Sequence, residues 1–462
     1  MKTFNRSRYF GDRAFYKMLM AIAVPVMLQN GLTNLVSLLD NIMVGAVGTE
    51  PMTAVSIVNQ LMLVFNLCIF GGLSGAGIYT AQFYGSKDHQ GVQNTFRFKL
   101  MLIAVILVLG IFVFLNWGDS LMALYLHEGS ETGDLAATAD YAAKYLQIML
   151  WGLFPFALTQ AYAGTLRETG ETMLPMKASA VAILVNLVFN YILIFGHFGA
   201  PAMGVEGAAW ATVLSRYVEC AIVLSWTHRH HEDARFIIGA YRNLRVPAPL
   251  VKKIFQNGMP LLINEFLWSA GIATLTQCYS TRGLAVVAAL NISSTVSNLF
   301  NVVWLAMGTA VSIIVGQHLG AGEFEEAEDS CWRILTFSVL GGVAVGALMF
   351  GFAHFFPQIY NTTDEVRQIA TSVLRVVAVA GILHAFNHCS YFTLRSGGKT
   401  WITFLFDSVY LWVISIPIAR ILSVGTMWNI VLVYAICQFS DIIKCVIGYI
   451  LLKKKVWINR IV

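Results

Sequence analysis

The sequence predicts an all-α integral membrane protein of twelve transmembrane helices, in two six-helix lobes that are related by internal duplication and enclose a central cavity. Three observations support this fold class: the composition, a series of long apolar runs, and a repeated motif. Of the 462 residues, 57% are hydrophobic and only 12% are charged, and the mean hydropathy is +0.67. This composition supplies too little polar surface to cover a soluble globule, so the chain is expected in a lipid bilayer.

Apolar runs long enough to cross a hydrocarbon core of about 30 Å recur along the whole chain and leave no room for a sizeable soluble domain. The first run is too long for a cleavable signal peptide and contains Asp40, so we expect it to remain as the first helix. The twelve expected spans are 17–42, 53–80, 95–117, 138–163, 173–196, 207–227, 253–279, 287–315, 332–356, 368–394, 400–422 and 430–452.

A motif in the first half of the chain returns in the second half. Ala81-Gln82-Phe83-Tyr84-Gly85 recurs as Gly316-Gln317-His318-Leu319-Gly320, with the two glutamines 235 positions apart (82 and 317). Pro25 and Pro260 share this offset, and Leu166-Arg167 recurs as Leu394-Arg395 at a slightly smaller one. Duplicated helix bundles are a common transporter architecture. We therefore predict an amino-terminal lobe at 1–235, a cytoplasmic linker at 236–252 and a carboxy-terminal lobe at 253–462.

Charged residues are distributed unequally between the two sets of loops. Lys and Arg concentrate at 2–17, 229–253 and 453–460, whereas acids such as Glu50 and Glu206 dominate the opposite loops. The positive-inside rule then predicts a multi-pass protein of the inner (plasma) membrane with both termini in the cytoplasm. No basic patch interleaved with aromatic residues indicates nucleic acid, and the seven isolated cysteines indicate neither a disulfide nor a zinc site. No arrangement of nucleophile and base indicates an enzyme.

Polar side chains form a continuous stripe along the first span. At helical spacing, Gln29, Thr33, Ser37 and Asp40 lie within one arc of the helix. A carboxylate inside a bilayer costs roughly 2.5–3.5 kcal/mol on insertion scales, so Asp40 is expected to face a bundle interior or a wet cavity. The alternative is a helix-end residue bonded to backbone amides. The stripe below Asp40 favours a cavity wall.

The second half carries its own interior polar groups. Glu265 lies deep in its span, with Trp268 beside it, and a purely structural acid is the alternative. His384 shares one face of its span with His388 and Tyr391. A histidine there can carry protons near neutral pH or serve as a neutral hydrogen-bonding group.

A set of polar and aromatic residues is expected to line a substrate cavity. Several of the amides repeat between the halves, as Asn66 and Asn301 do, although such groups also join helices to one another. The full set is Gln29, Thr33, Asn34, Ser37, Asn59, Asn66, Asn264, Trp268, Asn291, Asn298, Asn301, Asn387, His388, Tyr391 and Asp407.

Together these motifs resemble the multidrug and toxic compound extrusion (MATE) family, within the multidrug/oligosaccharidyl-lipid/polysaccharide flippase superfamily. The resemblance covers the whole chain. It rests on Asp40-Asn41-Ile42-Met43-Val44-Gly45, Gly207-Ala208-Ala209-Trp210-Ala211-Thr212, Leu394-Arg395-Ser396-Gly397-Gly398-Lys399-Thr400 and the two glutamine repeats. It implies a secondary active efflux antiporter that exports amphipathic small molecules, cationic ones foremost, in exchange for inward H+ or Na+ by alternating access. Such a protein needs no cofactor and is expected to work as a monomer.

The resemblance also implies an ion-coupling site in each lobe. Asp40 takes the place of the first-lobe acid, with Asn186, Asn190 and Thr212 around it and a possible Na+ position beside it. Many members have an acid where this chain has Asn190, so one negative charge is missing. Glu265 matches the second-lobe acid of one branch, whose helix-ten aspartate is replaced here by His384. Imidazole does not replace a carboxylate as a sodium ligand, so proton coupling fits better, and sodium stays open.

Two other functions are compatible with this architecture. A flippase for a lipid-linked saccharide or another amphipathic lipid must hold phosphates and would be expected to carry several cavity arginines, whereas the best-placed interior charges here are acids. A passive channel or sensor would be indicated by flux that is insensitive to ion gradients.

Overall fold

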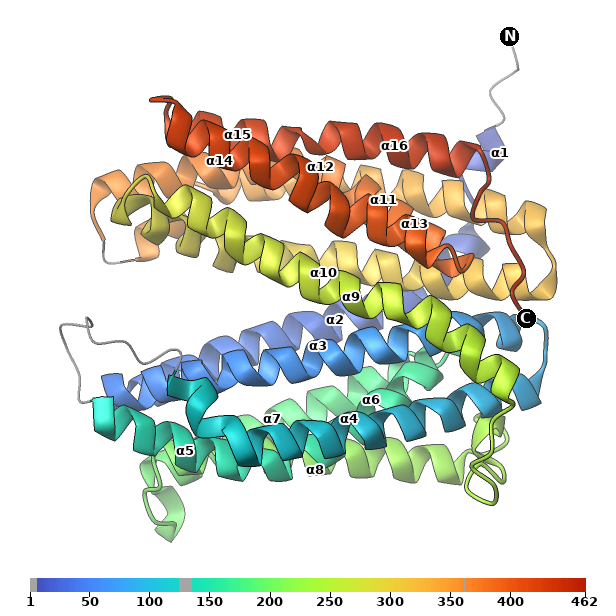
Figure 1. Cartoon of the computed structure of the whole chain (residues 1–462), viewed down its shortest axis with the longest axis horizontal. Helices are drawn as coiled ribbons and strands as arrows, with labels where there is room; N and C mark the ends of the chain where they lie inside the picture. Colours follow the sequence, from blue (N-terminus) through green and yellow to red (C-terminus); the bar gives the residue numbers. More distant parts are fainter. Residues whose placement is uncertain (1–5, 124–134, 361) are drawn as a thin grey trace. The chain divides into compact units, whose positions relative to one another are not determined.

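The computed structural model describes residues 6–123, 135–360 and 362–462 of the chain, and all regular structure in these ranges is helical. This confirms the all-α prediction. The elements of the first half are α1 (Arg6–Tyr9), α2 (Arg13–Gly45), α3 (Thr49–Gly85), α4 (His89–Ala123), α5 (Leu135–Trp151), α6 (Leu153–Glu168), α7 (Met173–Phe195), η1 (His197–Gly199), α8 (Val205–Arg229) and η2 (Arg235–Ile237) (Figure 1).

The second half continues the same pattern of long helices. Its elements are α9 (Ala248–Ser280), α10 (Leu284–Ala321), α11 (Phe324–Phe352), η3 (Phe356–Ile359), α12 (Asp364–Ser396), α13 (Thr400–Phe404), η4 (Leu405–Val409), η5 (Leu411–Ser415), α14 (Ile416–Gly425), α15 (Ile430–Phe439) and α16 (Asp441–Lys453). The segments η4 and η5 are π-helical, so the backbone between α13 and α14 is wound more widely than an α-helix.

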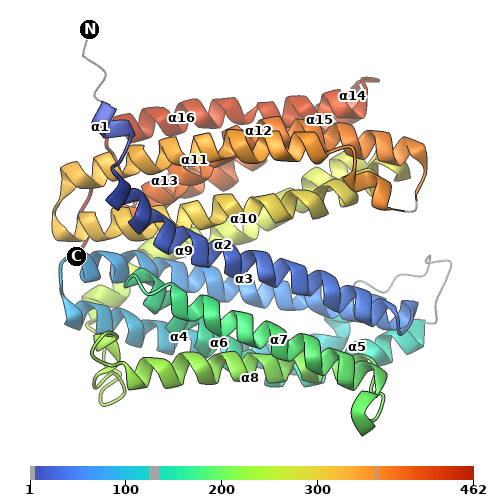
Figure 2. The ribbon, with the colours of Figure 1, turned by 180° about the vertical axis from the view of Figure 1, so that it is seen from behind.

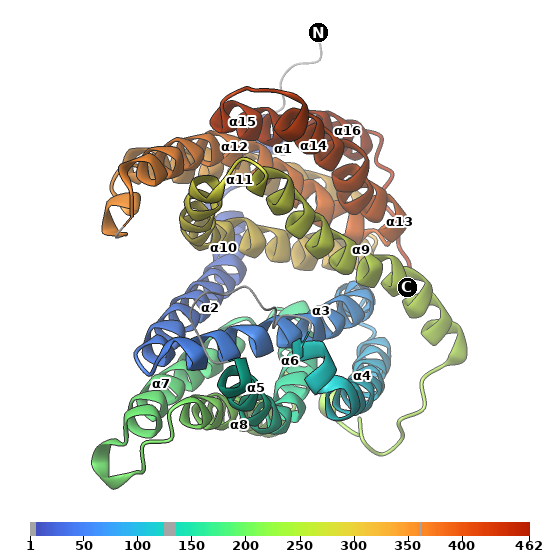
Figure 3. The same cartoon turned by 60° about the vertical axis from the view of Figure 1, so that its left-hand side comes forward.

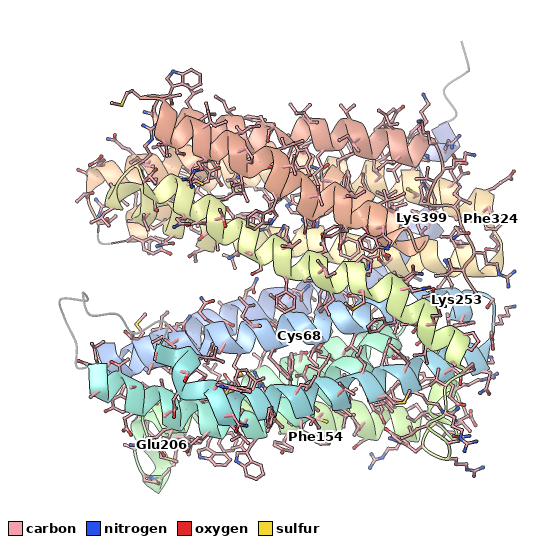
Figure 4. The ribbon with its side chains drawn as sticks, in the orientation of Figure 1. Cys68, Phe154, Glu206, Lys253, Phe324 and Lys399 are labelled. Atoms are coloured by element: carbon pink, nitrogen blue, oxygen red, sulfur yellow. The ribbon has the colours of Figure 1, made fainter. Side chains whose placement is uncertain are left out.

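Each of the twelve expected spans is helical, and ten helical segments of the described ranges are long and apolar enough to cross a membrane. The expected span 138–163 is divided at Gly152 into α5 and α6, of 17 and 16 residues. The helix α9 is long enough, but Asn264 and Glu265 interrupt its apolar run. Large apolar side chains such as Phe154, 55% exposed, lie on the outer surface, where a bilayer would solvate them (Figure 4). The chain is a multi-pass membrane protein.

The contacts within the chain divide it into two compact units. We call Leu28–Thr80 with His89–Lys253 the amino-terminal unit, and Met1–Met27, Ala81–Asp88 and Ile254–Val462 the carboxy-terminal unit. The division passes through α2 and α3, so the carboxy-terminal unit includes the first turns of α2 and the end of α3. The lobe boundaries that the repeat predicts follow the chain order instead, and they stay a prediction.

The amino-terminal unit is built on the pair α7 and α8, which lie side by side in two opposite views (Figures 1 and 2). They approach closely at Gly207, where a Cβ atom would lie 2.5 Å from the carbonyl oxygen of Leu193. Small residues allow this because membrane helices associate by van der Waals packing. The helices α5 and α6 pack beside α8 (Figure 3).

Part of the predicted linker is bound to this unit. Phe236 is buried, and its ring lies 4.9 Å from that of Phe96 on α4. The guanidinium of Arg97 donates through Nε to the carbonyl oxygen of Ala240 at 2.9 Å and through a terminal nitrogen to that of Gly239 at 3.0 Å. Gln93 donates to the carbonyl oxygen of Ile238 at 2.6 Å. The segment 236–240 is therefore anchored to α4.

The carboxy-terminal unit is built on α10, α11 and α12, which are neighbours in the front and rear views (Figures 1 and 2). Glycines allow the close approach: a Cβ at Gly308 of α10 would collide with the ring of Phe392 on α12. The buried core between these helices includes Ile314, Leu335, Leu394 and Trp457.

The two copies of the repeated motif contact each other within the carboxy-terminal unit. A Cβ atom on Gly85 would collide with the carbonyl oxygen of Gln317, and one on Gly320 would collide with the carbonyl oxygen of Gln82. The two contacts are equivalent, because both glycines stand three residues after the glutamine of their own motif. The motif that reveals the duplication therefore forms a backbone crossing between the ends of α3 and α10, and only glycine fits there.

The side chain of Gln82 also holds the end of the chain. Its Nε2 donates to the carbonyl oxygens of Ser396 and Asn459 at 3.0 and 3.1 Å, and its Oε1 accepts from the backbone N–H of Ile461 at 2.9 Å. The amide is fully buried. Gln82 thus connects the crossing to the α12–α13 turn and to the carboxy-terminal tail.

Candidate functional site

The first candidate site lies inside the amino-terminal unit, around Asp40 on α2. Asn190 Nδ2 donates to Asp40 Oδ1 at 2.5 Å and to Asn186 Oδ1 at 3.1 Å. Asn186 Nδ2 in turn donates to Thr212 Oγ1 on α8 at 3.3 Å. The two asparagines are four residues apart on α7 and therefore share one face. The four residues expected around a first-lobe ion site thus form one hydrogen-bonded chain, and their role in coupling stays a prediction.

One polar atom in this chain of hydrogen bonds is left over. Asn190 is 1% exposed, and within the described ranges its Oδ1 has no hydrogen-bond partner. Buried acceptors are nearly always satisfied, so an unpaired oxygen beside a carboxylate needs an explanation. A proton or a small cation held next to Asp40 would supply one. The amide can also turn over, so that it donates to the carboxylate or accepts from the protonated acid.

A second polar cluster lies in the same unit, and the sequence did not single it out. Gln29 Nε2 donates to Ser179 Oγ at 2.7 Å, and Ser179 Oγ donates to the carboxylate of Glu219. Arg167 approaches the Oε1 of Gln29 at 3.5 Å. Ser179 lies seven residues before Asn186 on α7, and Glu219 lies seven after Thr212 on α8. A spacing of seven residues is about two helical turns, so it places both clusters on the same faces of α7 and α8. This spacing was the signal in the sequence that could have revealed the second cluster.

The other polar residues expected from the first half differ in the exposure of their side chains. Thr33, Asn34, Ser37 and Asn59 are exposed in the described structure, whereas Asn66 is half-buried. The hydroxyl of Thr33 donates to the carbonyl oxygen of Gln29 at 2.9 Å. Exposure is required of residues that line a cavity, but lining a cavity stays a prediction for these residues.

The second candidate site lies inside the carboxy-terminal unit, around Asn264 and Glu265 on α9. Glu265 is half-buried, and Arg395 and Asp407 are the charged groups that act on it. Asn264 is 2% exposed and donates to Asp407 Oδ2 at 3.1 Å and to the Tyr391 hydroxyl at 3.3 Å. Asn264 therefore binds Asp407 directly, from the position next to Glu265 in α9.

Asp407 is paired with Lys444, a residue outside the sets expected from the sequence. Lys444 Nζ on α16 lies 2.6 Å from Asp407 Oδ1, and the two side chains are only 13% and 17% exposed. Asp407 stands on the π-helical segment η4, and Ser408 next to it donates to Asn264 Oδ1 at 2.7 Å. Long basic side chains within a span commonly extend toward its end, where the charge reaches water. The structure instead shows an ion pair between two spans.

His384 lies apart from Glu265 in its hydrogen bonding. Its Nε2 is 3.2 Å from Gln438 Oε1 and 3.8 Å from Asp441 Oδ2. The neighbouring His388 is influenced electrostatically by His384, Asp407 and Lys444. These polar contacts of His384 go to α15 and α16, and its proposed part in ion coupling stays a prediction.

The remaining predicted cavity residues of this half are spread over three helices. Trp268 on α9 and the amides Asn291, Asn298 and Asn301 on α10 are exposed. Asn387 is buried, and its Oδ1 accepts from the thiol of Cys445 at 3.2 Å. Across the described ranges, no group of three or more His, Cys, Asp or Glu side chains is arranged to hold a metal ion.

Comparison with known proteins identifies the family. The sequence model of the MatE family matches this chain twice, over residues 25–192 and 260–421, which together make up more than half of it. The chain belongs to the MatE family. The two matched segments begin at Pro25 and Pro260, the pair of prolines that the internal repeat had aligned.

Two curated relatives of this MatE chain are multidrug resistance proteins by name. It is 24% identical over 408 residues to the "Probable multidrug resistance protein NorM" of Thermotoga maritima, covering 88% of this chain and 85% of that protein. It is 25% identical over 409 residues to the "Probable multidrug resistance protein YoeA" of Bacillus subtilis, covering 87% and 85%.

Solved structures show the same fold for this MatE chain. It matches an outward-facing multidrug resistance MATE family transporter of the MOP superfamily with a TM-score of 0.84 and 21% identity, over 98% of each chain. It matches a MATE in complex with MaL6 equally well, with a TM-score of 0.84 and 21% identity over 97% of each chain. These likenesses confirm the predicted fold of twelve helices in two lobes.

Proposed function

We propose that this protein is a secondary active antiporter that exports amphipathic, cationic small molecules in exchange for inward H+ by alternating access. The observation that carries this proposal is the Asp40 site. A carboxylate within a membrane-spanning helix is hydrogen-bonded by Asn190, whose own Oδ1 is buried and has no hydrogen-bond partner among the described residues. Intramembrane carboxylates are costly and are retained mainly where they bind protons, ions or substrates.

Charge competition is the proposed mechanism. The ionised carboxylates of Asp40 and Glu265 lie in surroundings of low dielectric constant, where a bound proton or the positive charge of a substrate stabilises them. The two ligands therefore compete, and occupancy by one of them biases the conformational equilibrium toward the state that binds it better. A membrane potential supplies about 2.3 kcal/mol per charge per 100 mV, so one inward proton is a useful driving force.

Protons fit the first site better than sodium. Na+ is a hard cation and prefers several oxygen ligands, with carboxylates supplying the compensating charge. Asp40 is the only acid in the chain of hydrogen bonds formed with Asn190, Asn186 and Thr212. A single carboxylate is neutralised completely by one proton. Sodium is the second candidate, and Asp40 and the Oδ1 of Asn190 would be two of its ligands.

The proposed setting is the plasma membrane of the cell, with both termini in the cytoplasm and one chain acting alone. The basic segments 2–17, 229–253 and 453–460 support this orientation. The duplication supports a monomer, because one chain then supplies both lobes.

Reconstituted protein tests the proposal. Proteoliposomes would be loaded with a fluorescent cationic dye, and pH, sodium and electrical gradients would be imposed one at a time. Export should follow the pH gradient. Asp40→Asn and Glu265→Gln should abolish gradient-driven export while the protein is still made and folded. Glu50→Gln, which removes an acid from the first turn of α3, is the matched control and should export normally.

The outcomes are distinct. Unchanged export by both Asp40→Asn and Glu265→Gln would refute the coupling assignment. Export that follows only the sodium gradient would show that the coupling ion is Na+ and not H+. Dye movement that ignores every gradient would identify a passive pathway and not an antiporter.

A further inference from the structure

The ammonium group of Lys444 occupies surroundings that would suit an organic cation. Its Nζ lies 2.6 Å from Asp407 Oδ1, 5.1 Å from the centre of the Phe406 ring and 5.9 Å from the centre of the Tyr410 ring. A carboxylate with aromatic faces within about 6 Å is the combination that recognises ammonium and quaternary ammonium ligands. These three groups come from one stretch of chain, residues 406–410.

The backbone of that stretch is unusual in a way that favours a binding role. Residues 405–409 and 411–415 are π-helical, and they interrupt what would otherwise be a continuous span from Thr400 to Gly425. Single π-helical turns within α-helices frequently occur at functional sites. Asn264 holds the second carboxylate oxygen, Asp407 Oδ2, at 3.1 Å, so the acid is oriented from α9 as well.

Stability alone is a weak explanation for the ion pair. The two side chains are 13% and 17% exposed, and the cost of desolvating a buried pair offsets much of its attraction. Lys444 lies more than two turns before the end of α16 at Lys453, which places its charge well within the span.

A second acid offers the ammonium another position. Asp441 lies three residues before Lys444, on the same face of α16, and acts on it electrostatically. A carboxylate oxygen of Asp441 is 3.8 Å from His384 Nε2. Asp441 is therefore a second carboxylate on the same helix face as Lys444. The other titratable or charged groups around the pair are His384, His388, Tyr391 and Arg395 on α12, Glu265 on α9, Tyr410, and Cys445 on α16.

We propose that Asp407, Phe406 and Tyr410 form a binding site for the ammonium group of a substrate, and that Lys444 is its resident occupant. A substrate cation enters by displacing the Lys444 ammonium, which moves toward Asp441. Because a substrate cation must outcompete the Lys444 ammonium for Asp407, Lys444 sets the minimum affinity that a substrate needs. This inference rests on the proposed export of cations, and it assigns a specificity-determining role to a residue outside the predicted site.

Binding of tetraethylammonium to the purified full-length protein tests the inference. This probe has no proton of its own, so any pH dependence belongs to the protein. Lys444→Met keeps the length of the stem and removes the charge. It should bind the probe about tenfold more tightly than the wild type, because Asp407 then lacks its cationic partner. The gain should shrink as the pH is lowered and Asp407 takes up a proton.

Two further variants control for folding. The charge-balanced double variant Asp407→Asn/Lys444→Met should fold and should lose the gain at every pH. Lys444→Arg should fold and bind the probe more weakly than the wild type, because a guanidinium holds a carboxylate through two hydrogen bonds. The inference is overturned if folded Lys444→Met binds no more tightly than the wild type, or if Lys444→Arg binds as well as the wild type.

The same probe separates this inference from the proposed function. Wild-type proteoliposomes should export tetraethylammonium under a pH gradient. If they do not respond to any gradient, the antiport proposal fails for this class of cation. If they export it while the Lys444 variants bind as the wild type does, only the role of Lys444 is refuted.

Discussion

An alanine at Gly85 or Gly320 would place a methyl group against a backbone carbonyl oxygen of the other copy of the repeated motif. At Gly85 the Cβ would collide with the oxygen of Gln317, and at Gly320 with the oxygen of Gln82. A flexible side chain could move aside, but here the obstacle is helix backbone. Relief therefore requires the ends of α3 and α10 to separate.

The expected magnitude combines two opposing effects. Overpacking of a tight contact typically destabilises by about 1–3 kcal/mol. Alanine in a helix gains about 0.5–1 kcal/mol over glycine, which partly offsets that loss. Gly341→Ala on α11 is the matched control, because nothing lies within 4 Å of its added Cβ and only the gain applies. Each crossing variant should therefore be less stable than the control by about 2 kcal/mol.

Thermal unfolding of the purified protein in detergent, followed by circular dichroism, measures this difference. Gly85→Ala and Gly320→Ala should lower the midpoint temperature by similar amounts, because their contacts are equivalent. The double variant should lose less than the sum of the two, since one separation of the helices relieves both collisions. Midpoints equal to that of Gly341→Ala would refute the crossing.

Two further predictions concern the amino-terminal unit. Glu168→Gln leaves the fully buried ammonium of Lys99 without its ion pair, and it should lower the free energy of unfolding by about 3–5 kcal/mol. The double variant Lys99→Met/Glu168→Gln should recover most of that loss. Equal stability of the single and double variants would contradict this prediction. Arg97→Ala removes the hydrogen bonds to the carbonyl oxygens of residues 239 and 240, so tryptic cleavage within 235–242, followed on gels, should become faster. Asp233→Ala, a change on the exposed surface nearby, should leave the cleavage rate unchanged. Equal cleavage rates for the two variants would show that Arg97 does not anchor the segment.

The sequence was most informative where a single helix or a repeat carries the signal. Polar residues at helical spacing pointed to the interior face of α2, and the structure gathers Asp40, Asn186, Asn190 and Thr212 into one hydrogen-bonded chain. The interior position of Asp40 follows from the period of the α-helix and from the cost of placing a carboxylate in lipid, whereas Asn186, Asn190 and Thr212 were expected from the family resemblance alone. The family resemblance supplied which helices meet.

The sequence failed where partners depend on the local winding of a helix. Lys444 was not among the expected site residues, and Asp407 was only one of several expected cavity residues. Asp407 lies within the π-helical turn at 405–409, which departs from the α-helical period, and no periodic pattern predicts such a turn. The anchoring of 236–240 by Arg97 was also invisible, because backbone carbonyls leave no mark in a sequence.

The amino-acid order by itself determined that the chain enters a membrane, that its spans are helical and that it arose by duplication. Those properties follow from hydropathy, from the backbone hydrogen bonds that lipid cannot satisfy, and from repeated motifs. Only the tertiary structure decided that the repeated glycines form a backbone crossing and that Lys444 neutralises Asp407. The reason is physical: both depend on distances of a few ångströms between helices far apart in the chain, which packing sets and local pattern does not.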